Sequence, residues 1–258
     1  MAIIYALANQ KGGVGKTTTT INLGAYLAKL GQRVLLVDID PQANATSSVG
    51  IDKHTVKNGS YEALLDMDNG APNILTNPKL KISILPSSPS LAGAEVELVD
   101  ELARETRLKR ALESISGRYD YILIDCPPSL GLLTLNGLVA AANGVLIPVQ
   151  CEYLALEGLG QLTQTIERVR NVLSPDLQVR GVILTMFDSR TNLANDVVAE
   201  VQRFFPNQVF SAIIPRSVRL AEAPSYGLPI SVYDPKSTGA EAYEALANEL
   251  LAQDNQTS

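Results

Sequence analysis

The stretch from Asn9 to Thr19, NQKGGVGKTTT, constrains the fold of this chain more than any other. An apolar run, AIIYALA, precedes it, and a helical pattern from about Thr17 to Lys29 follows it and stops at Gly31. A strand, a glycine-rich loop and then a helix place backbone N–H groups and the helix N-terminus around phosphates. The sequence therefore predicts a phosphate-binding loop between the first strand and the first helix.

The loop departs from the usual pattern in one respect. Gly15, Lys16 and Thr17 fit G-x-x-x-x-G-K-[ST], but Gln10 stands where the first glycine is expected, and a second lysine, Lys11, follows it. In such loops the lysine contacts the β- and γ-phosphates and the threonine hydroxyl binds Mg²⁺. We expect ATP and Mg²⁺ as cofactors, and the residues expected to contact the nucleotide are Lys11, Gly12, Gly13, Val14, Gly15, Lys16, Thr17 and Thr18.

The rest of the chain alternates short apolar runs with longer helical patterns. The strand candidates are AIIYALA, RVLLVDID, KISILPS, YDYILIDCPP, GVLIPVQ, VRGVILTMFD and VFSAIIP. Helical patterns are also expected at about 94–115, 157–173 and 195–205. Continuous apolar strands are typical of sheets covered on both faces. We predict an α/β fold, a doubly wound, mostly parallel sheet in one domain spanning residues 1–258, with the last six or so residues disordered.

Carboxylates end two of the predicted strands. YILIDCPPS ends in Asp125, the pattern of a Walker B acid, which lies beside the metal. LLVDIDPQANAT places Asp38 and Asp40 two residues apart after the second strand. A pair beside a nucleotide loop favours a role in positioning the attacking water and the metal shell, and a capping role for one of them is the alternative. The predicted metal set is Thr17, Asp125 and Asp40.

Composition excludes several other functions. The net charge is −6, so the whole protein is repelled by nucleic acid and anionic membranes, and such binding needs a local patch. Two cysteines without a C-x-x-C pair and one histidine, His54, supply no zinc ligand set, and a reducing cytoplasm fits this cysteine usage. The apolar stretch LVAAANGVLIPV is broken by Asn143, Gly144 and Pro148, too short for a membrane span.

Longer motifs make a family resemblance specific. KGGVGKTT, DIDPQAN, YDYILIDCPPSLG, CEYLALEGLGQL and IPRSVRLAEAPSYGLPI together resemble the ParA/Soj branch of the deviant Walker A ATPases, the partitioning family related to MinD. The resemblance extends from Ile3 to about Leu250. It leaves no room ahead of the first strand for the helix-turn-helix domain of larger plasmid ParA proteins, so operator-specific binding is not expected.

The resemblance implies a role for the second lysine. In this family the residue matching Lys11 reaches the nucleotide of the other subunit, so that two ATP molecules are sandwiched in a homodimer. By position, the resemblance makes Asp40 the water-activating carboxylate and Asp38 a supporting one, with Lys11 and Lys16 completing the catalytic set. It places adenine near Met186, Phe187 and Pro215. Since no catalytic glutamine or arginine finger is evident, slow basal hydrolysis stimulated by a ParB-like partner is expected.

The resemblance also implies non-specific binding to double-stranded DNA. Arg190, Arg216 and Arg219 match positions where Soj-like proteins carry DNA-contacting arginines. We expect a cytoplasmic, nucleoid-associated protein that does not bind membranes, because the last 22 residues lack the basic amphipathic helix of MinD. The alternatives are a MinD-like or cargo-positioning ATPase that acts on a membrane or a protein assembly, and a metal-cluster relative, for which Cys126 and Cys151 are poor candidates.

Overall fold

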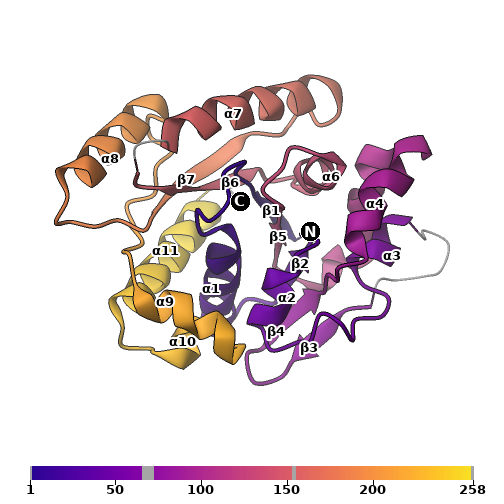
Figure 1. The fold of residues 1–258 in the computed structure, drawn as a ribbon, viewed down its shortest axis with the longest axis horizontal. Helices are drawn as coiled ribbons and strands as arrows, with labels where there is room; N and C mark the ends of the chain where they lie inside the picture. The colour runs from indigo at the N-terminus through magenta and orange to yellow at the C-terminus, as the bar shows by residue number, and fades with distance from the viewer. Residues whose placement is uncertain (1, 66–72, 153–154, 257–258) are drawn as a thin grey trace.

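A seven-stranded sheet organises the molecule (Figure 1). The computed structural model describes residues 2–65, 73–152 and 155–256, and in these ranges the strand order is β3-β4-β2-β5-β1-β6-β7. Every neighbouring pair is parallel except β3 with β4. The strands are β1 (Ile3–Leu7), β2 (Val34–Asp38), β3 (Leu75–Asn77), β4 (Ile82–Leu85), β5 (Tyr121–Asp125), β6 (Val145–Gln150) and β7 (Val179–Thr185). The predicted fold class is confirmed.

Helices cover both faces of this sheet, which is why β2 and β5 are buried along their whole length. On one face α1 (Lys16–Lys29), α9 (Val218–Glu222), α10 (Ile230–Tyr233) and α11 (Thr238–Asn255) contribute to a common core with α2 (Asn44–Ser48). The other face packs against α3 (Ser60–Leu65), α4 (Leu91–Glu97), α5 (Arg107–Glu113), α6 (Leu132–Ala140), α7 (Ala155–Val172) and α8 (Asn192–Phe204). Short 3₁₀ turns occupy Leu98–Asp100, Arg104–Thr106, Ser116–Arg118 and Ala223–Tyr226.

Two predicted elements differ from the structure. The single helix expected at 94–115 is broken into α4, two 3₁₀ turns and α5, with Ala103 in a left-handed conformation at φ 53°. A left-handed alanine ends helical hydrogen bonding, so the chain turns here and exposes Leu102. The run VFSAIIP forms no continuous strand. It lies beside β7, with an isolated bridge between Val209 and Val182 and backbone hydrogen bonds from Phe210 to Val182 and from Ile214 to Leu184, both at 2.9 Å.

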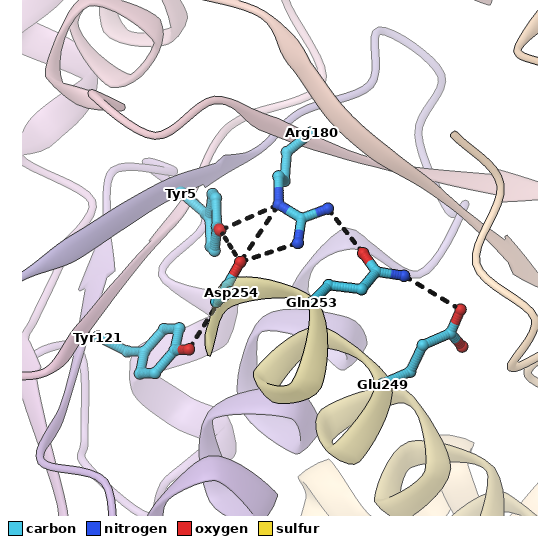
Figure 2. A network of polar contacts seen from close by, with 6 residues as sticks. All are labelled: Tyr5, Tyr121, Arg180, Glu249, Gln253 and Asp254. Atoms are coloured by element: carbon cyan, nitrogen blue, oxygen red, sulfur yellow. Dashed lines mark hydrogen bonds and ion pairs between the residues drawn. The ribbon is translucent and has the colours of Figure 1, made fainter. Parts of the chain in front are cut away.

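The C-terminal helix is fixed at its last turn by a buried polar network (Figure 2). Asp254 is 5% exposed and accepts hydrogen bonds from the hydroxyls of Tyr5, at 2.7 Å, and Tyr121, at 2.9 Å. Arg180 donates to the same carboxylate at 2.8 Å and to the Gln253 side chain at 2.8 Å. The expected disorder of the last residues was therefore wrong for residues 253–255, because this network holds them against three strands. Residues 257 and 258 lie outside the described residues.

The parallel strands bring their polar ends to one edge. The backbone register pairs Asp125 with Leu7 on one side and with Asp38 on the other. Gln150 and Thr185 end β6 and β7 at that edge and pair with each other. This edge is where a doubly wound sheet binds ligands. No helix within the described ranges is both long and apolar enough to cross a bilayer.

Candidate nucleotide-binding site

The loop between β1 and α1 is shaped to receive phosphates. Gly13 and Gly15 have φ of 74° and 87°, a conformation that favours glycine because it has no Cβ. A Cβ built on Gly12 or Gly13 meets no atom within 4 Å, so open space faces the backbone here. The hydroxyl of Thr185 donates to the carbonyl oxygen of Val14 at 2.8 Å and ties the loop to the end of β7. Thr185 therefore fixes one side of the loop to β7, while the side at Gly12 and Gly13 is open.

The start of α1 has no side-chain cap among the residues that the structure describes. The first turn of this 14-residue helix contains no acidic residue. Lys16 is the first helical residue and is 7% exposed, with Nζ donating to the carbonyl oxygen of Lys11 at 3.2 Å. Burial lowers the pKa of Lys16, against the opposing effect of nearby carboxylates. Uncapped N–H groups and a desolvated ammonium together form a site that an anion would stabilise.

Asp125 lies directly beneath this helix start. Its carboxylate accepts hydrogen bonds from the Thr17 hydroxyl at 2.7 Å and the Thr20 hydroxyl at 3.1 Å. The side chain is fully buried, and burial, with Asp38 and Asp40 nearby, raises the pKa of Asp125 to about 8. A divalent cation in front of Thr17 would relieve this cost, because a positive charge favours the ionised carboxylate.

The two carboxylates that follow β2 have different surroundings. Asp38 is fully buried and accepts from the backbone N–H and hydroxyl of Thr46 in α2, at 2.8 and 2.7 Å, and from the Asp40 N–H at 3.1 Å. Burial raises the pKa of Asp38 to about 6. Asp38 thus anchors α2, which is the capping role weighed as the alternative. Asp40 is 6% exposed, and among the described residues its carboxylate accepts only from the Gln42 N–H, at 2.9 Å.

The protein supplies only part of a metal shell. No three His, Cys, Asp or Glu side chains among the described residues are gathered so that they could hold a metal ion. Mg²⁺ is commonly bound through one or two protein oxygens together with water and phosphate oxygens. Thr17 and Asp125, joined by a hydrogen bond beside Lys16, fit that chemistry. These residues could therefore hold Mg²⁺ when a nucleotide supplies the remaining ligands.

A pocket of about 260 Å³ adjoins the loop on the side of α11. Met186 and Pro215, two of the residues predicted to surround adenine, line it, whereas Phe187 does not. Phe187 instead packs its ring against the core of the opposite face and forms backbone hydrogen bonds to Ile214 and Arg216. The pocket is also lined by Gly15 and Thr18 of the loop, which the sequence assigned to the nucleotide.

Lys11 lies in the loop without an ion partner. It is half-buried, and no carboxylate in the described part of the chain forms an ion pair with it. Its backbone N–H donates to the Asn9 side chain at 3.0 Å, and Asn9 donates in turn to the Pro148 carbonyl at 2.7 Å. The backbone of Lys11 is therefore fixed while its ammonium group has no acidic partner in this part of the chain.

Of the three arginines assigned to DNA, Arg190 and Arg216 lie on connections after β7, and Arg219 lies in α9. Arg190 is 84% exposed and pairs with Asp188 at 2.6 Å, which lowers the pKa of Asp188 to about 2. Arg216 pairs with Glu152 at 2.8 Å and also lines the pocket beside the loop. Arg219 pairs with Glu222 at 3.0 Å and with Asp234 at 3.4 Å. No pattern in the sequence indicates these pairs. All three are exposed, and the Arg190 pair is bidentate, with Nε and Nη2 donating to the two Asp188 oxygens at 2.8 and 2.6 Å.

Sequence reasoning missed several residues that shape the site. They are Thr46, Thr185, Ser217, Leu220 and Tyr243. Tyr243 comes from α11, and its hydroxyl lies 3.1 Å from the hydroxyl of Thr19 in α1. Only Thr185 carried a signal, since it ends an apolar run at the ligand edge. Both cysteines are buried and free, and residues 153–154 of CEYLALEGLGQL lie outside the described residues.

Comparison with known proteins gives similarity along the whole chain. A protein-family model described as "AAA domain" matches residues 1–179. The sporulation initiation inhibitor protein Soj of Bacillus subtilis (strain 168) is 55% identical over 252 residues, which cover 98% of this chain and 99% of Soj. The chromosome partitioning protein ParA of Myxococcus xanthus (strain DK1622) is 56% identical over 256 residues, covering 99% of this chain and 90% of that protein.

A solved structure shares the same architecture. The crystal structure described as cobyrinic acid a,c-diamide synthase from Mycobacterium smegmatis, with bound ATP analog and magnesium, has a TM-score of 0.88 and 40% identity. The match covers 100% of this chain and 98% of that one. That neighbour binds a nucleotide and magnesium on the fold described above.

Proposed function

Because this chain belongs to the family of Soj- and ParA-type partitioning ATPases, we propose that it works as an ATP-controlled DNA-binding switch. In this proposal the ATP-bound protein dimerises around two nucleotides and binds duplex DNA without sequence preference. A ParB-like partner stimulates hydrolysis and thereby releases the dimer from DNA. The protein acts in the cytoplasm, on the nucleoid, as a single domain spanning residues 1–258.

The observation that carries this proposal is the position of Lys11. It stands beside the open space at Gly12 and Gly13 with its backbone fixed and no acidic partner in the described chain. ATP brings about four negative charges, of which Mg²⁺ and Lys16 offset about three. A Lys11 from the second subunit supplies about one more. Loss of the γ-phosphate removes much of this attraction, so hydrolysis separates the subunits.

In this proposal the loop binds the phosphates, and residues at the strand ends bind the metal and the base. Lys16 and the uncapped N–H groups of α1 bind the phosphates, and residues 11–18 surround them. Thr17, Asp125 and Asp40 would hold Mg²⁺, which when bound would supply positive charge to the γ-phosphate. Met186 and Pro215 line the base pocket beside Thr18.

Hydrolysis depends on Asp40 more than on Asp38. Asp40 has a free carboxylate oxygen among the described residues, whereas both oxygens of Asp38 accept hydrogen bonds from α2 or from Asp40. Asp40 therefore orients the attacking water, and Asp38 fixes the segment that carries Asp40. Since no arginine finger reaches the loop from the described part of the chain, basal turnover is slow and a partner accelerates it.

Arg190, Arg216 and Arg219 contact DNA phosphates in this proposal. Each is more than half exposed, and each exchanges a surface carboxylate for a phosphate. The bidentate pair of Arg190 with Asp188 makes that exchange more costly for Arg190 than for Arg216 or Arg219. Contacts to phosphates carry no base information, so the binding is non-specific. Dimerisation doubles the number of contacts and converts weak binding by one subunit into avidity.

The test is binding of the purified protein to two unrelated duplexes with ATP, with ADP and without nucleotide, at low and moderate salt. The proposal expects retention with ATP only, equal on both duplexes and falling steeply with salt. Equal binding in all three states would refute the nucleotide switch. Absence of binding in every state would refute the DNA role and favour a membrane or protein cargo instead.

A further inference from the structure

Two adjoining pockets lie at the edge of the sheet opposite the nucleotide loop. One, of about 260 Å³, lies between the end of α1, the β3–β4 turn and α10. The other, of about 410 Å³, lies between that turn and the residues that precede β2 and β5. Ala28 and Lys81 line both. The two pockets therefore form one continuous surface at the amino ends of the strands.

The charged residues that line this surface are all basic. We call it the basic edge, and its charged residues are Lys29, Arg33, Lys79, Lys81 and Arg118. No aspartate or glutamate lines either pocket. In a chain with 27 acidic and 21 basic residues, a gathering of five cations from separate parts of the sequence creates a local field opposite to that of the whole protein.

Three of these cations are available to bind an anion. No carboxylate in the described ranges forms an ion pair with Lys79, Lys81 or Arg118. All three are exposed. The other two have surface partners, Glu244 for Lys29 at 3.3 Å and Asp120 for Arg33 at 2.6 Å. The Lys29 side chain is 57% exposed, so its pair is weak. Arg33 binds both oxygens of Asp120, at 3.0 and 2.6 Å, and is therefore the one cation of the five that is firmly paired within the described part of the chain.

The turn that carries the two lysines is preformed. Asn77 accepts hydrogen bonds from the backbone N–H groups of Lys79 and Leu80, at 3.1 and 3.2 Å, and Lys81 has a left-handed φ of 55°. Leu80 is buried beneath the turn. The lysines are thus held at a fixed backbone position, which lowers the ordering cost of binding.

Lysines beside an edge strand have a second possible purpose. They discourage pairing between the edges of two molecules, and β3 is the edge strand here. Preventing such edge-to-edge pairing requires lysines only near β3. It does not account for Arg33 and Arg118, which precede the inner strands β2 and β5 and line the same surface.

We propose that the basic edge is a second binding surface for the phosphates of duplex DNA, separate from Arg190, Arg216 and Arg219. This inference rests on the proposed function, in which the ATP-bound dimer binds DNA. α10 lines the pocket beside Lys79 and Lys81, and Arg219 pairs with Asp234 directly after α10 (Figure 1). The two surfaces therefore flank the same short helix, and a duplex bound at Arg219 has the basic edge beside it.

The test compares two double variants of equal charge. Lys79→Gln with Lys81→Gln removes two cations of the basic edge, and Lys109→Gln with Arg110→Gln removes two exposed cations from α5 on the other face of the sheet. Neither pair belongs to the nucleotide site, so thermal unfolding and basal hydrolysis serve as controls for folding. DNA binding with ATP is then measured by fluorescence anisotropy across a salt series.

The basic edge variant is expected to bind at least about tenfold more weakly at about 0.1 M salt, with a salt slope reduced by about 2 per protomer. The α5 variant is expected to bind like the wild type. Equal binding by both variants would overturn the inference while leaving the proposed function standing. Failure of the wild type itself to bind DNA would refute the proposed function instead.

Discussion

Asp254→Ala removes the carboxylate at the centre of the network in Figure 2. The variant leaves Arg180 without its charged partner, and it leaves the hydroxyls of Tyr5 and Tyr121 without the acceptor they share. These groups come from three strands, whereas Asp254 comes from the last turn of α11. We expect the variant to loosen the C-terminal helix from the sheet.

The magnitude follows from the burial of the pair. Breaking a buried ion pair by removing one partner costs about 3–5 kcal/mol, because the remaining charge is left buried. The Arg180 side chain is 18% exposed, so water recovers part of that cost, and we expect a loss of about 2–4 kcal/mol. For a domain of this size that corresponds to a fall in Tm of about 5–12 °C.

Urea and thermal unfolding of the ligand-free protein measure this loss. The matched control is Glu244→Ala on the same helix, whose pair with Lys29 has both side chains about half exposed. That change is expected to cost less than about 1 kcal/mol. Equal, small effects of the two substitutions would refute the conclusion that Asp254 anchors α11.

Three further predictions concern the proposed site. Because burial raises the pKa of Asp125 from 3.8 to about 8, this group lowers the stability of the ligand-free protein progressively as pH rises from about 4 to about 8, and the loss is complete above that value. Asp125→Asn should recover about 1–3 kcal/mol at pH above about 8 in urea unfolding without Mg²⁺, and parallel pH curves for both proteins would contradict this. Asp40→Asn keeps an acceptor for the Gln42 N–H and should slow phosphate release by about 10²–10⁴-fold with little change in nucleotide affinity; near-normal turnover would exclude Asp40 as the water-orienting group. Arg219→Gln should reduce the salt slope of DNA binding by about 0.9 per protomer on any duplex, and an unchanged slope would remove Arg219 from the interface.

The features that sequence predicted correctly are those set by local chemistry. The resemblance to Soj- and ParA-type ATPases is confirmed by relatives that match nearly the whole chain. The glycine loop, α1 and the apolar strands require only neighbouring residues and a regular period, so their order could be predicted. The convergence of Asp38 and Asp125 at one edge then followed from parallel pairing.

Features that depend on distant partners could not be predicted. β3 has only three residues and exists because it pairs with β4. The run VFSAIIP lies beside β7 and makes scattered backbone hydrogen bonds to it, but no continuous ladder, a difference that its apolar pattern does not reveal. The commitment of Asp38 to α2 depends on Thr46, eight residues away. The Phe187 side chain packs against the core on the opposite face of the sheet and does not line the base pocket. Tertiary packing determines this orientation, and the neighbouring residues in the sequence do not reveal it.

The ion pairs and the C-terminal anchor show the same limit. Arg216 forms an ion pair with Glu152, which is 64 residues away in the sequence. Asp254 accepts a hydrogen bond from Tyr5, which is 249 residues away. The polar tail QDNQTS carries no apolar pattern, so its composition favoured disorder, yet a single buried aspartate orders it as far as Asn255. Long-range pairing of charged groups leaves no periodic signal in a sequence.

The measurement that tests the central claim most directly is the sedimentation of wild type and Lys11→Ala with Mg²⁺ and ATP, ADP or no nucleotide. Lys109→Ala, an exposed lysine outside the site, is the control. The account predicts that wild type and the control form a dimer with ATP only. It predicts that Lys11→Ala binds ATP with nearly normal affinity but remains a monomer. A normal ATP-dependent dimer of Lys11→Ala would contradict the claim that this lysine completes the nucleotide site of the other subunit.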